Sequence, residues 1–189
     1  MNTVICERGD VASLVEIWCE CFGEPPSVPT EFYSTVTCDV LVAREDGKAV
    51  GALNILPVRL GEYSGGYIFA AGVKKEFRGR GIFDGLLSAA EKHLAEKGAD
   101  FVCLIPADVT LARTYVTRGY TEKVERYSPK NAPLRSGLEI YANSDFSDFA
   151  TPDGESESGS VFQFGLLKPL SGNFAPTYPL KFAWFMGES

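Results

Sequence analysis

The chain has 189 residues, which suits one domain and is long enough to bury an apolar core. With 45% hydrophobic and 23% charged residues it has the composition of a globular protein, and its apolar runs are too short to cross a bilayer. The net charge of −7 comes mostly from residues 144–160, which hold five of the 25 acidic residues and none of the 18 basic ones. General nucleic-acid binding is therefore not indicated, and we expect this Ser/Gly-rich stretch to be a flexible loop.

The N-terminus and the cysteines set further expectations. The first ten residues lack the basic and long apolar regions of a signal peptide, so we expect a cytoplasmic protein. Five cysteines are scattered through apolar segments and the chain has one histidine. These features predict reduced thiols and no metal site.

The first part of the chain predicts two helices and a three-stranded meander. Asp10 is a suitable N-cap for a helix that ends near residue 22, and its apolar residues recur at helical spacing. The Pro-rich segment 24–30 ends this helix, and a short helix over 30–36 follows. The turns EDGK and GEYSGG separate the strands. The predicted strands cover residues 38–46, 49–60 and 67–73.

The second part alternates helices and strands. A helix begins near residue 82 and ends at Gly98, and the segment 99–107 after it is apolar enough for a strand buried on both faces. A short helix ends at Gly119, and a strand over 120–128 follows it. Further strands are predicted over 137–143, 161–170 and 181–187. This order predicts a mixed α/β sheet with helices on its faces.

The segment VKKEFRGRGIFDGLL, residues 73–87, joins a predicted strand to a predicted helix through closely spaced glycines. Amide N–H groups at a helix N-terminus lack helical partners and carry partial positive charge, so such a junction binds anions. Glycines let a phosphate approach the backbone, and Arg78 and Arg80 match its geometry. We predict a diphosphate site here and expect Lys74 and Lys75 to be solvated. An ordinary solvated basic turn is the alternative.

Other phosphate-binding motifs fit this segment less well. A Walker loop would end in GKS or GKT, which are absent here. A dinucleotide fingerprint would follow the strand directly, whereas Gly79, Gly81 and Gly85 form G-x-G-x-x-x-G five residues later. An RG-rich RNA-binding segment would be repeated. An unrelated nucleotide-phosphate-binding domain nevertheless stays open at this point.

Two segments, RGRGIF at 78–83 and LARTYVTRGY at 111–120, have the form and separation of a pair of known motifs. They resemble the Gln/Arg-x-x-Gly-x-Gly/Ala and A-x-x-L-Y-x-x-x-G-F motifs of the GNAT superfamily of acyl-CoA-dependent N-acyltransferases. Phe83 replaces the small sixth residue of the first motif, and Tyr115 matches the tyrosine of the second. The segments LIPA and WCECFG resemble an atypical bacterial branch. The resemblance covers roughly residues 1–125.

The resemblance implies a GNAT-like fold, in which a mixed, largely antiparallel α/β sheet is flanked by helices and splayed between its fourth and fifth strands. We therefore predict a single GNAT-like domain over residues 1–189. Its core would cover about 1–128, and a strand-rich C-terminal part, 129–189, would contain the acidic loop 144–160.

The resemblance also implies acetyl-CoA as co-substrate and no metal. In the family the pantetheine arm lies along the backbone of the central strand, and the pyrophosphate lies at the turn that follows. A bulge is expected in that strand, and Gly72 suits it. The implied pantetheine-binding residues are Ala71, Gly72 and Val73. The implied pyrophosphate-binding residues are Arg78, Gly79, Arg80, Gly81, Ile82, Phe83 and Asp84.

The implied reaction is N-acetyl transfer by direct attack of a primary amine on the thioester in a ternary complex. A backbone N–H near Val73 would polarise the carbonyl, and Tyr115 would protonate the departing thiolate. No glutamate lies in YIFAAGV or FVCLIPA, where many members carry the base. Glu24, Glu31 and the C-terminal carboxylate of Ser189 are more simply structural or solvated. We therefore expect a water relay or an amine that arrives neutral.

The acceptor is less clearly indicated. It would be a small-molecule or protein amine, and the residues of 22–36 and those after 126 are expected to wall its site. Nucleic-acid and membrane partners are not expected, and homodimerisation is left open. Asp108 stands where many members have an asparagine that touches the cofactor, so an acid there would bond differently or point away. Because the base is missing, a non-catalytic acyl-CoA-binding protein on the same fold is the alternative function.

Overall fold

The computed structural model describes residues 2–5, 11–129, 138–142, 150–152, 164–176 and 180–186. The chain forms two compact units, Met1–Leu56 with Ile68–Glu96 and Pro57–Tyr67 with Lys97–Ser189. The strands β3 (Lys48–Leu60) and β4 (Tyr63–Val73) are each divided between the two units. The predicted acidic loop lies outside the described residues except for the short strand β8 (Ala150–Pro152).

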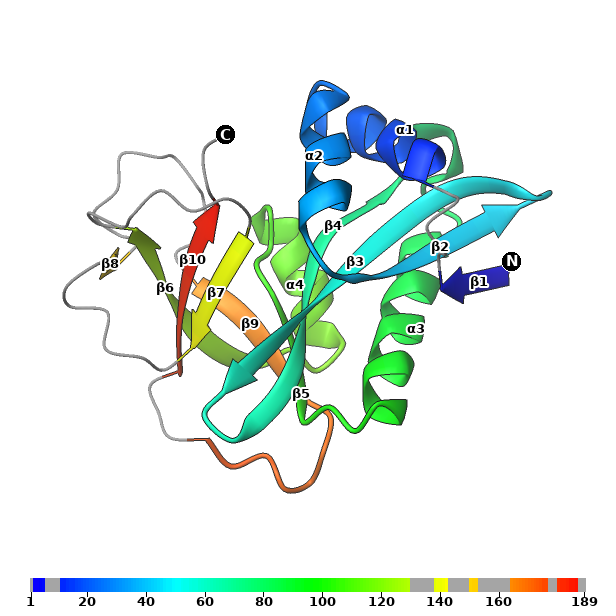
Figure 1. Ribbon diagram of the computed structural model, residues 1–189. Helices are drawn as coiled ribbons and strands as arrows, with labels where there is room; N and C mark the ends of the chain where they lie inside the picture. The colour runs from blue at the N-terminus through cyan, green and yellow to red at the C-terminus, as the bar shows by residue number, and fades with distance from the viewer. Residues whose placement is uncertain are drawn as a thin grey trace. The chain divides into compact units, whose positions relative to one another are not determined.

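The first unit is built on a meander of strands. β1 (Asn2–Ile5), β2 (Asp39–Glu45), β3 and β4 are hydrogen-bonded in this order (Figure 1). Asp46 and Gly47 join β2 to β3 with φ values of 50° and 78°. Both residues are left-handed, as the commonest two-residue hairpin turn requires. The predicted meander and the EDGK turn are confirmed.

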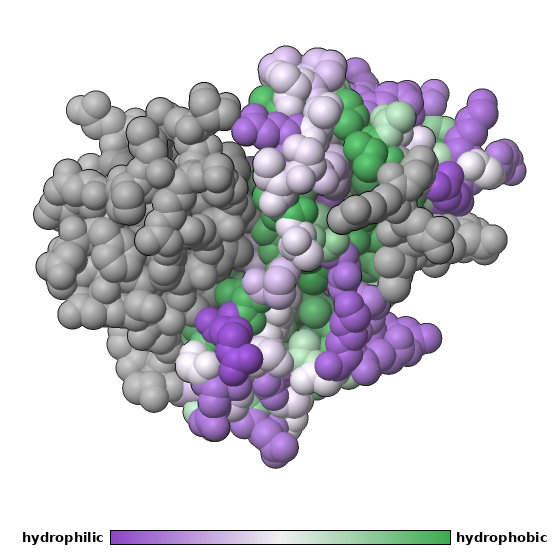
Figure 2. Space-filling view, viewed as in Figure 1, coloured by the Kyte–Doolittle hydropathy of each residue, from purple (hydrophilic) through white to green (hydrophobic). Residues whose placement is uncertain are grey.

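Helices cover both faces of these strands. On one face lie α1 (Val11–Phe22) and α2 (Ser27–Thr35), and Leu14 and Ile17 of α1 pack against β2 and β3. On the other face lies α3 (Ile82–Glu96), where Leu86 is 3.2 Å from the position that a Cβ on Gly51 would occupy (Figure 1). The outward side of α3 is hydrophilic (Figure 2). These strands therefore carry apolar residues on both faces.

Two predicted boundaries are wrong, each for a local reason. α2 begins at Ser27 instead of residue 30, because Pro29 falls in the first helical turn, where its missing N–H is not needed. β4 begins at Tyr63 instead of residue 67, so the last four residues of GEYSGG are strand. A Cβ on Gly65 would lie 2.5 Å from the ring of Phe101. That glycine marks a close approach rather than a turn.

The second unit contains the remaining elements. Its strands are hydrogen-bonded in the order β5-β9-β6-β10-β7, with β8 on β6 and β5 beside β4. β10 and β6 are parallel, whereas β9 is antiparallel to both β5 and β6. The elements are β5 (Phe101–Leu104), α4 (Val109–Thr117), β6 (Glu122–Pro129), β7 (Leu138–Ala142), β8, β9 (Phe164–Pro169) and β10 (Leu180–Met186).

Two features hold the start of β5 in this unit. All four residues of β5 are buried, which confirms the predicted inner strand, although it covers Phe101–Leu104 and not the whole of 99–107. The Asp100 carboxylate just before it accepts hydrogen bonds from the Ser64 N–H at 2.9 Å and from the Ser171 hydroxyl at 3.1 Å. Asp100 therefore links β4, β5 and the segment after β9.

The predicted mixed, largely antiparallel α/β sheet with flanking helices is confirmed. The splay between the fourth and fifth strands and the single domain with its core over about 1–128 stay predictions. Within the part of the chain that the structure describes, no helix is long and apolar enough to cross a membrane.

Candidate functional site

A glycine turn leads from β4 into α3. The short 3-10 helix η2 (Lys75–Phe77) comes first, and then Gly79 and Gly81 adopt φ values of 75° and 73°. Apart from their chain neighbours, no atom of the described residues lies within 4 Å of the position that a Cβ on either glycine would occupy, so space is open on that side of the turn. The α3 ladder begins where the Gly85 N–H donates to the Gly81 carbonyl at 3.0 Å. The positive end of the helix therefore lies at this open turn.

The two arginines of the turn are held differently. Arg78 donates through Nε to the Val73 carbonyl at 2.8 Å, which fixes its guanidinium beside the end of β4. Arg80 donates to the Glu76 carbonyl at 3.0 Å and to the Glu45 carboxylate at 3.2 Å. Arg78 is therefore the better placed cation for a phosphate, since Arg80 is already engaged with a carboxylate.

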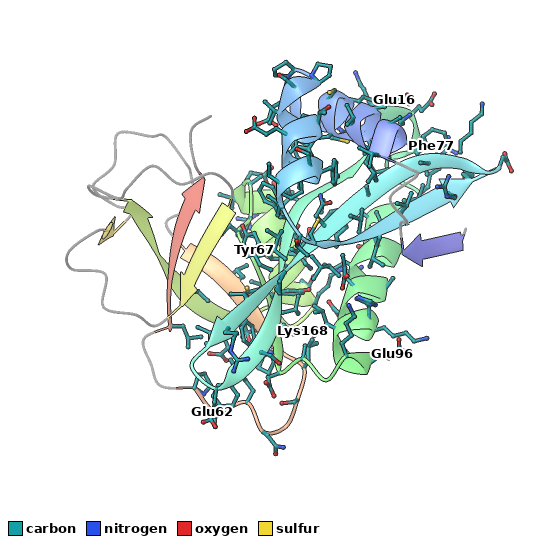
Figure 3. All side chains as sticks on the ribbon, in the orientation of Figure 1. Glu16, Glu62, Tyr67, Phe77, Glu96 and Lys168 are labelled. Atoms are coloured by element: carbon teal, nitrogen blue, oxygen red, sulfur yellow. The ribbon has the colours of Figure 1, made fainter. Side chains whose placement is uncertain are left out.

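Helix α1 holds the segment between β4 and the turn. The Glu16 carboxylate accepts a hydrogen bond from Lys74 Nζ at 2.6 Å, and the Glu20 carboxylate accepts one from the Lys75 N–H at 2.7 Å. Glu16 and Phe77, labelled in Figure 3, mark the helix and the 3-10 turn that are joined in this way. The Lys74 side chain is only 13% exposed, so the prediction that it is solvated is wrong.

The end of β4 contains a strained residue. Ala70 has a φ of 45°, in the left-handed region that a residue with a Cβ rarely adopts. The bulge expected at Gly72 stays a prediction. Gly72 is also needed because a Cβ there would lie 2.8 Å from Cys21 Sγ of α1. Ala70 and Ala71 are partly exposed, whereas Val73 is buried.

Phe69, directly before Ala70, is held through both its ring and its backbone. Its ring centroid lies 5.6 Å from that of Trp18 on α1 and 5.3 Å from that of Phe32 on α2. Its carbonyl accepts a hydrogen bond from Asn54 Nδ2 at 3.2 Å. Asn54, on β3, has no exposed surface, and its Oδ1 has no hydrogen-bond partner among the described residues. A buried polar side chain is therefore hydrogen-bonded to the residue that precedes the strained Ala70.

Tyr115 lies on α4 in the second unit. It is 6% exposed, and its ring centroid is 5.7 Å from that of Tyr120. The Asp108 carboxylate caps α4 by accepting a hydrogen bond from the Leu111 N–H at 2.8 Å, so this acid has a structural role. Burial, and secondarily the charge of Asp108, raise the pKa of Tyr115 to about 12. The phenol therefore stays protonated at neutral pH and is a weaker acid than an ordinary tyrosine.

The candidate bases are not brought to the end of β4 by any contact that the structure describes. The Glu24 carboxylate accepts a hydrogen bond from the indole N–H of Trp18, Glu31 is exposed, and Ser189 lies outside the described residues. Cys103 on β5 is buried, and burial raises the pKa of its thiol well above the ordinary value. Among the described side chains, no group of three or more histidines, cysteines and acids could hold a metal ion.

Sequence reasoning missed three contributors to this region: the left-handed Ala70, the buried Asn54 and the acids of α1. Only Asn54 leaves a signal in the sequence, because it is the single polar residue in AVGALNILPV. The acids of α1 look like an ordinary solvated helix face, since their partners lie more than 50 residues away along the chain. Nothing in the sequence indicates that an alanine is left-handed.

Comparison with known proteins supports the assignment that these features suggest. Residues 6–122 match the family model described as acetyltransferase (GNAT) domain. A curated acetyltransferase from Photorhabdus laumondii is 31% identical over 123 residues, which are 61% of this chain and 82% of that protein. These matches rule out the alternative of an unrelated nucleotide-phosphate-binding domain.

Solved structures show the same fold. A GNAT family N-acetyltransferase from Escherichia coli, in complex with CoA, has a TM-score of 0.61 at 12% identity, covering 97% of this chain and 89% of that one. The ribosomal-protein-S18-alanine N-acetyltransferase of Escherichia coli has a TM-score of 0.60 at 16% identity, covering 94% and 99%. At such identities the likeness is one of fold. The family model and the sequence relative together show that the chain belongs to the GNAT acetyltransferase family.

Proposed function

We propose that this protein is an N-acetyltransferase that transfers the acetyl group of acetyl-CoA to a primary amine by direct attack in a ternary complex. The observation that carries the proposal is the open turn at the start of α3, with left-handed Gly79 and Gly81 and the fixed guanidinium of Arg78. Such a turn suits a diphosphate. Because the chain belongs to the GNAT acetyltransferase family, acetyl-CoA is the diphosphate-containing ligand that we expect here. The neighbour solved with CoA supports this choice.

Binding of the co-substrate would rely mainly on backbone groups. Arg80 would contribute its charge more than a direct contact, because Glu45 engages its guanidinium. The Asp84 side chain is exposed in the first turn of α3, where an acid favours the helix dipole. The proposed pantetheine-binding residues are Ala71, Gly72 and Val73, and the proposed pyrophosphate-binding residues are Arg78, Gly79, Arg80, Gly81, Ile82, Phe83 and Asp84.

Acetyl-CoA supplies an activated acetyl group whose transfer leaves a thiolate. A backbone N–H near Val73 would stabilise negative charge on the carbonyl oxygen, and Tyr115 would donate a proton to the thiolate. Proton transfer from a phenol with a pKa of about 12 to a thiolate whose thiol has a pKa of about 8.5 costs about 5 kcal/mol. This cost is well below the barrier of about 16 kcal/mol for an enzyme with about ten turnovers per second.

The acceptor amine would reach the site neutral or would lose its proton to water. The segments YIFAAGV and FVCLIPA contain no acid. The described contact of Glu24 is with the indole N–H of Trp18, which gives no support for a role as general base. We propose a small-molecule or protein amine as acceptor. One structural neighbour is the ribosomal-protein-S18-alanine N-acetyltransferase of Escherichia coli, so peptide amines belong among the candidates to be tested.

Acetyl-CoA binding is tested by thermal unfolding of the wild type and of Gly81→Ala. Acetyl-CoA at 100 times its Kd should stabilise the wild type by about 2.7 kcal/mol. Gly98→Ala is the matched control, because Gly98 is also left-handed, with a φ of 76° and open space around its Cβ position, but lies after the other end of α3. Both variants should lose similar stability, and only Gly81→Ala should lose affinity. Stabilisation by NADH or GTP without stabilisation by acetyl-CoA would overturn the proposal.

A non-catalytic acyl-CoA-binding protein is the second candidate. Two observations favour it: the segments YIFAAGV and FVCLIPA contain no acid, and the pKa of Tyr115 is raised to about 12. Release of the CoA thiol, followed with a panel of small-molecule and peptide amines, separates the two functions. A protein that acetyl-CoA stabilises but that releases no thiol with any amine is a binder.

A further inference from the structure

We infer that Asn54 is a positioning residue for acetyl transfer, because its side-chain amide holds the Phe69 carbonyl and so fixes the left-handed Ala70. Ala70 directly precedes Ala71, the first of the residues proposed to bind pantetheine. The inference rests on the proposed function for its chemical meaning. The contact between Asn54 and Phe69 belongs entirely to the first unit and is tested below without turnover as well.

The surroundings of Asn54 make a polar side chain unfavourable. Asn54 has no exposed surface, and its neighbours Leu53 and Ile55 on β3 are buried. Its partner across the strand pair, Val40, is buried as well. The unpartnered Oδ1 costs stability, and a leucine of similar volume would remove that cost. What asparagine adds over leucine is the hydrogen bond from Nδ2 to Phe69.

The orientation of the Asn54 amide follows from its partner. The Phe69 carbonyl accepts hydrogen bonds and has no proton to donate, so it requires the NH₂ end of the amide. Rotating the amide by 180° would place Oδ1 against a second acceptor. The buried unpartnered oxygen is therefore the consequence of holding Phe69.

The residue after Phe69 is Ala70, whose left-handed backbone must be imposed by neighbouring groups. An alanine adopts a left-handed φ only when its surroundings over-determine it. On one side, the ring of Phe69 is held by Trp18 and Phe32, and its carbonyl by Asn54. On the other side, Gly72 lies directly beneath α1. Removing the Asn54 bond releases the backbone of Phe69 while the aromatic contacts remain.

The expected effect lies at the thioester end of the co-substrate and not at the phosphate end. Asn54 contacts β4 nine residues before Arg78 and makes no described contact with the glycine turn. Asn54→Leu should therefore bind ADP, a pyrophosphate without pantetheine, as the wild type does. Its kcat should fall by about tenfold or more, because small displacements of a bound acyl group lower rates strongly. The KM for acetyl-CoA should change by less than about threefold.

The control and the rescue use neighbouring positions. Val40→Ala creates a cavity beside Asn54 and should lower the Tm at least as much as Asn54→Leu, yet its kcat should stay within about twofold of the wild type. The double variant Asn54→Leu/Ala70→Gly should recover at least about threefold in kcat over Asn54→Leu, because glycine adopts the left-handed conformation without strain. A purely structural role for Asn54 predicts no such rescue.

Amide hydrogen exchange tests the contact without turnover. In Asn54→Leu the amides of Ala70, Ala71 and Gly72 should exchange about ten times faster than in Val40→Ala. Unchanged exchange together with unchanged kcat overturns the inference. If the wild type neither binds acetyl-CoA nor transfers acetyl groups, the proposed function fails, while the exchange rates still decide whether Asn54 fixes Ala70.

A second variant covers the case in which Asn54→Leu does not fold. In Asn54→Asp the new side chain donates to the Phe69 carbonyl only when its carboxyl is protonated. Burial raises the pKa of this carboxyl, so exchange at Ala70–Gly72, corrected for intrinsic exchange, should slow toward the wild-type rate as the pH falls through that pKa. A variant in which the carboxyl becomes protonated without any slowing of the corrected exchange contradicts the inference.

Discussion

At the scale of single residues, Ala70 provides the sharpest test of how the site is built. Replacing it by glycine should leave the free energy of unfolding unchanged or raise it by up to about 1 kcal/mol, because relief of the left-handed strain offsets the greater freedom of glycine in the unfolded chain. Ala71→Gly, next to it but not left-handed, should instead lower that free energy by about 0.5–1 kcal/mol. Urea denaturation of both variants checks the opposite signs.

Tyr115 leads to a second residue-scale prediction. If it protonates the thiolate, Tyr115→Phe should lower kcat by about 100-fold or more, because general acid catalysis contributes at least that much. Tyr120→Phe is the matched control, since it removes a hydroxyl from the neighbouring buried ring and should change kcat by less than about threefold. Turnover of Tyr115→Phe that equals the wild-type rate would remove Tyr115 from its proposed role.

The raised pKa of Tyr115 gives a prediction about pH. The phenol remains a proton donor until the pH approaches about 12, so kcat should rise as the acceptor amine loses its proton and should not fall again below pH 10.5. The same shift bears on stability. The folded state favours the neutral phenol, and the stability present below pH 10 should be lost as the pH rises from 10 toward 12. A pH–rate profile and urea midpoints, compared with those of Tyr115→Phe, check both statements.

At the scale of elements, α1 and the glycine turn are linked through two carboxylates with different partners. Glu20 accepts from a backbone N–H, whereas Glu16 forms an ion pair in which its own side chain is 67% exposed. Glu20→Ala should therefore weaken acetyl-CoA binding by about three- to tenfold, by loosening the segment before the turn. Glu16→Ala should have a smaller effect, because the Glu16 carboxylate is mostly exposed and water weakens its attraction to Lys74. Isothermal titration of acetyl-CoA into both variants measures the difference, and equal effects would contradict this account.

Most helices and strands can be predicted from the sequence, because the spacing of apolar residues and the residues that form turns depend on short stretches of chain. The helix over α1, the hairpin at Asp46–Gly47 and the buried strand β5 were predicted in this way. The errors arose where one residue type has two uses. Pro29 predicts the end of a helix but lies in the first turn of α2, and the glycines of GEYSGG predict a turn although Gly65 makes room for a ring.

The site was predictable to the extent that it depends on the chain's own local geometry. The glycine turn at a helix start follows from the sequence, whereas the left-handed conformations of Gly79 and Gly81 come from the structure. The partners of that turn did not follow, since Glu20 and Lys75 are 55 residues apart in the sequence. The capping role of Asp108 and the burial of Tyr115 also required the packed structure.

At the scale of the whole molecule, the C-terminal third matters because β9 lies between β5 and β6. A chain ending at residue 128 would leave the edges of both strands unpaired, and exposed edges of this kind promote aggregation. We expect such a truncated protein to be insoluble or unfolded by circular dichroism, whereas a chain lacking only residues 187–189 should fold. A folded, monomeric 1–128 protein would show that the earlier strands suffice.

The position of β9 also affects how the protein is made. β5 ends at Leu104, and its partner begins at Phe164, so about 60 residues are synthesised between them. At about 5–20 residues per second, β5 waits some 3–12 s on the ribosome before the strand that covers its edge exists. During that interval the edge of β5 that pairs with β9 has no native partner. The sheet of the second unit is therefore completed only after β9 has been synthesised.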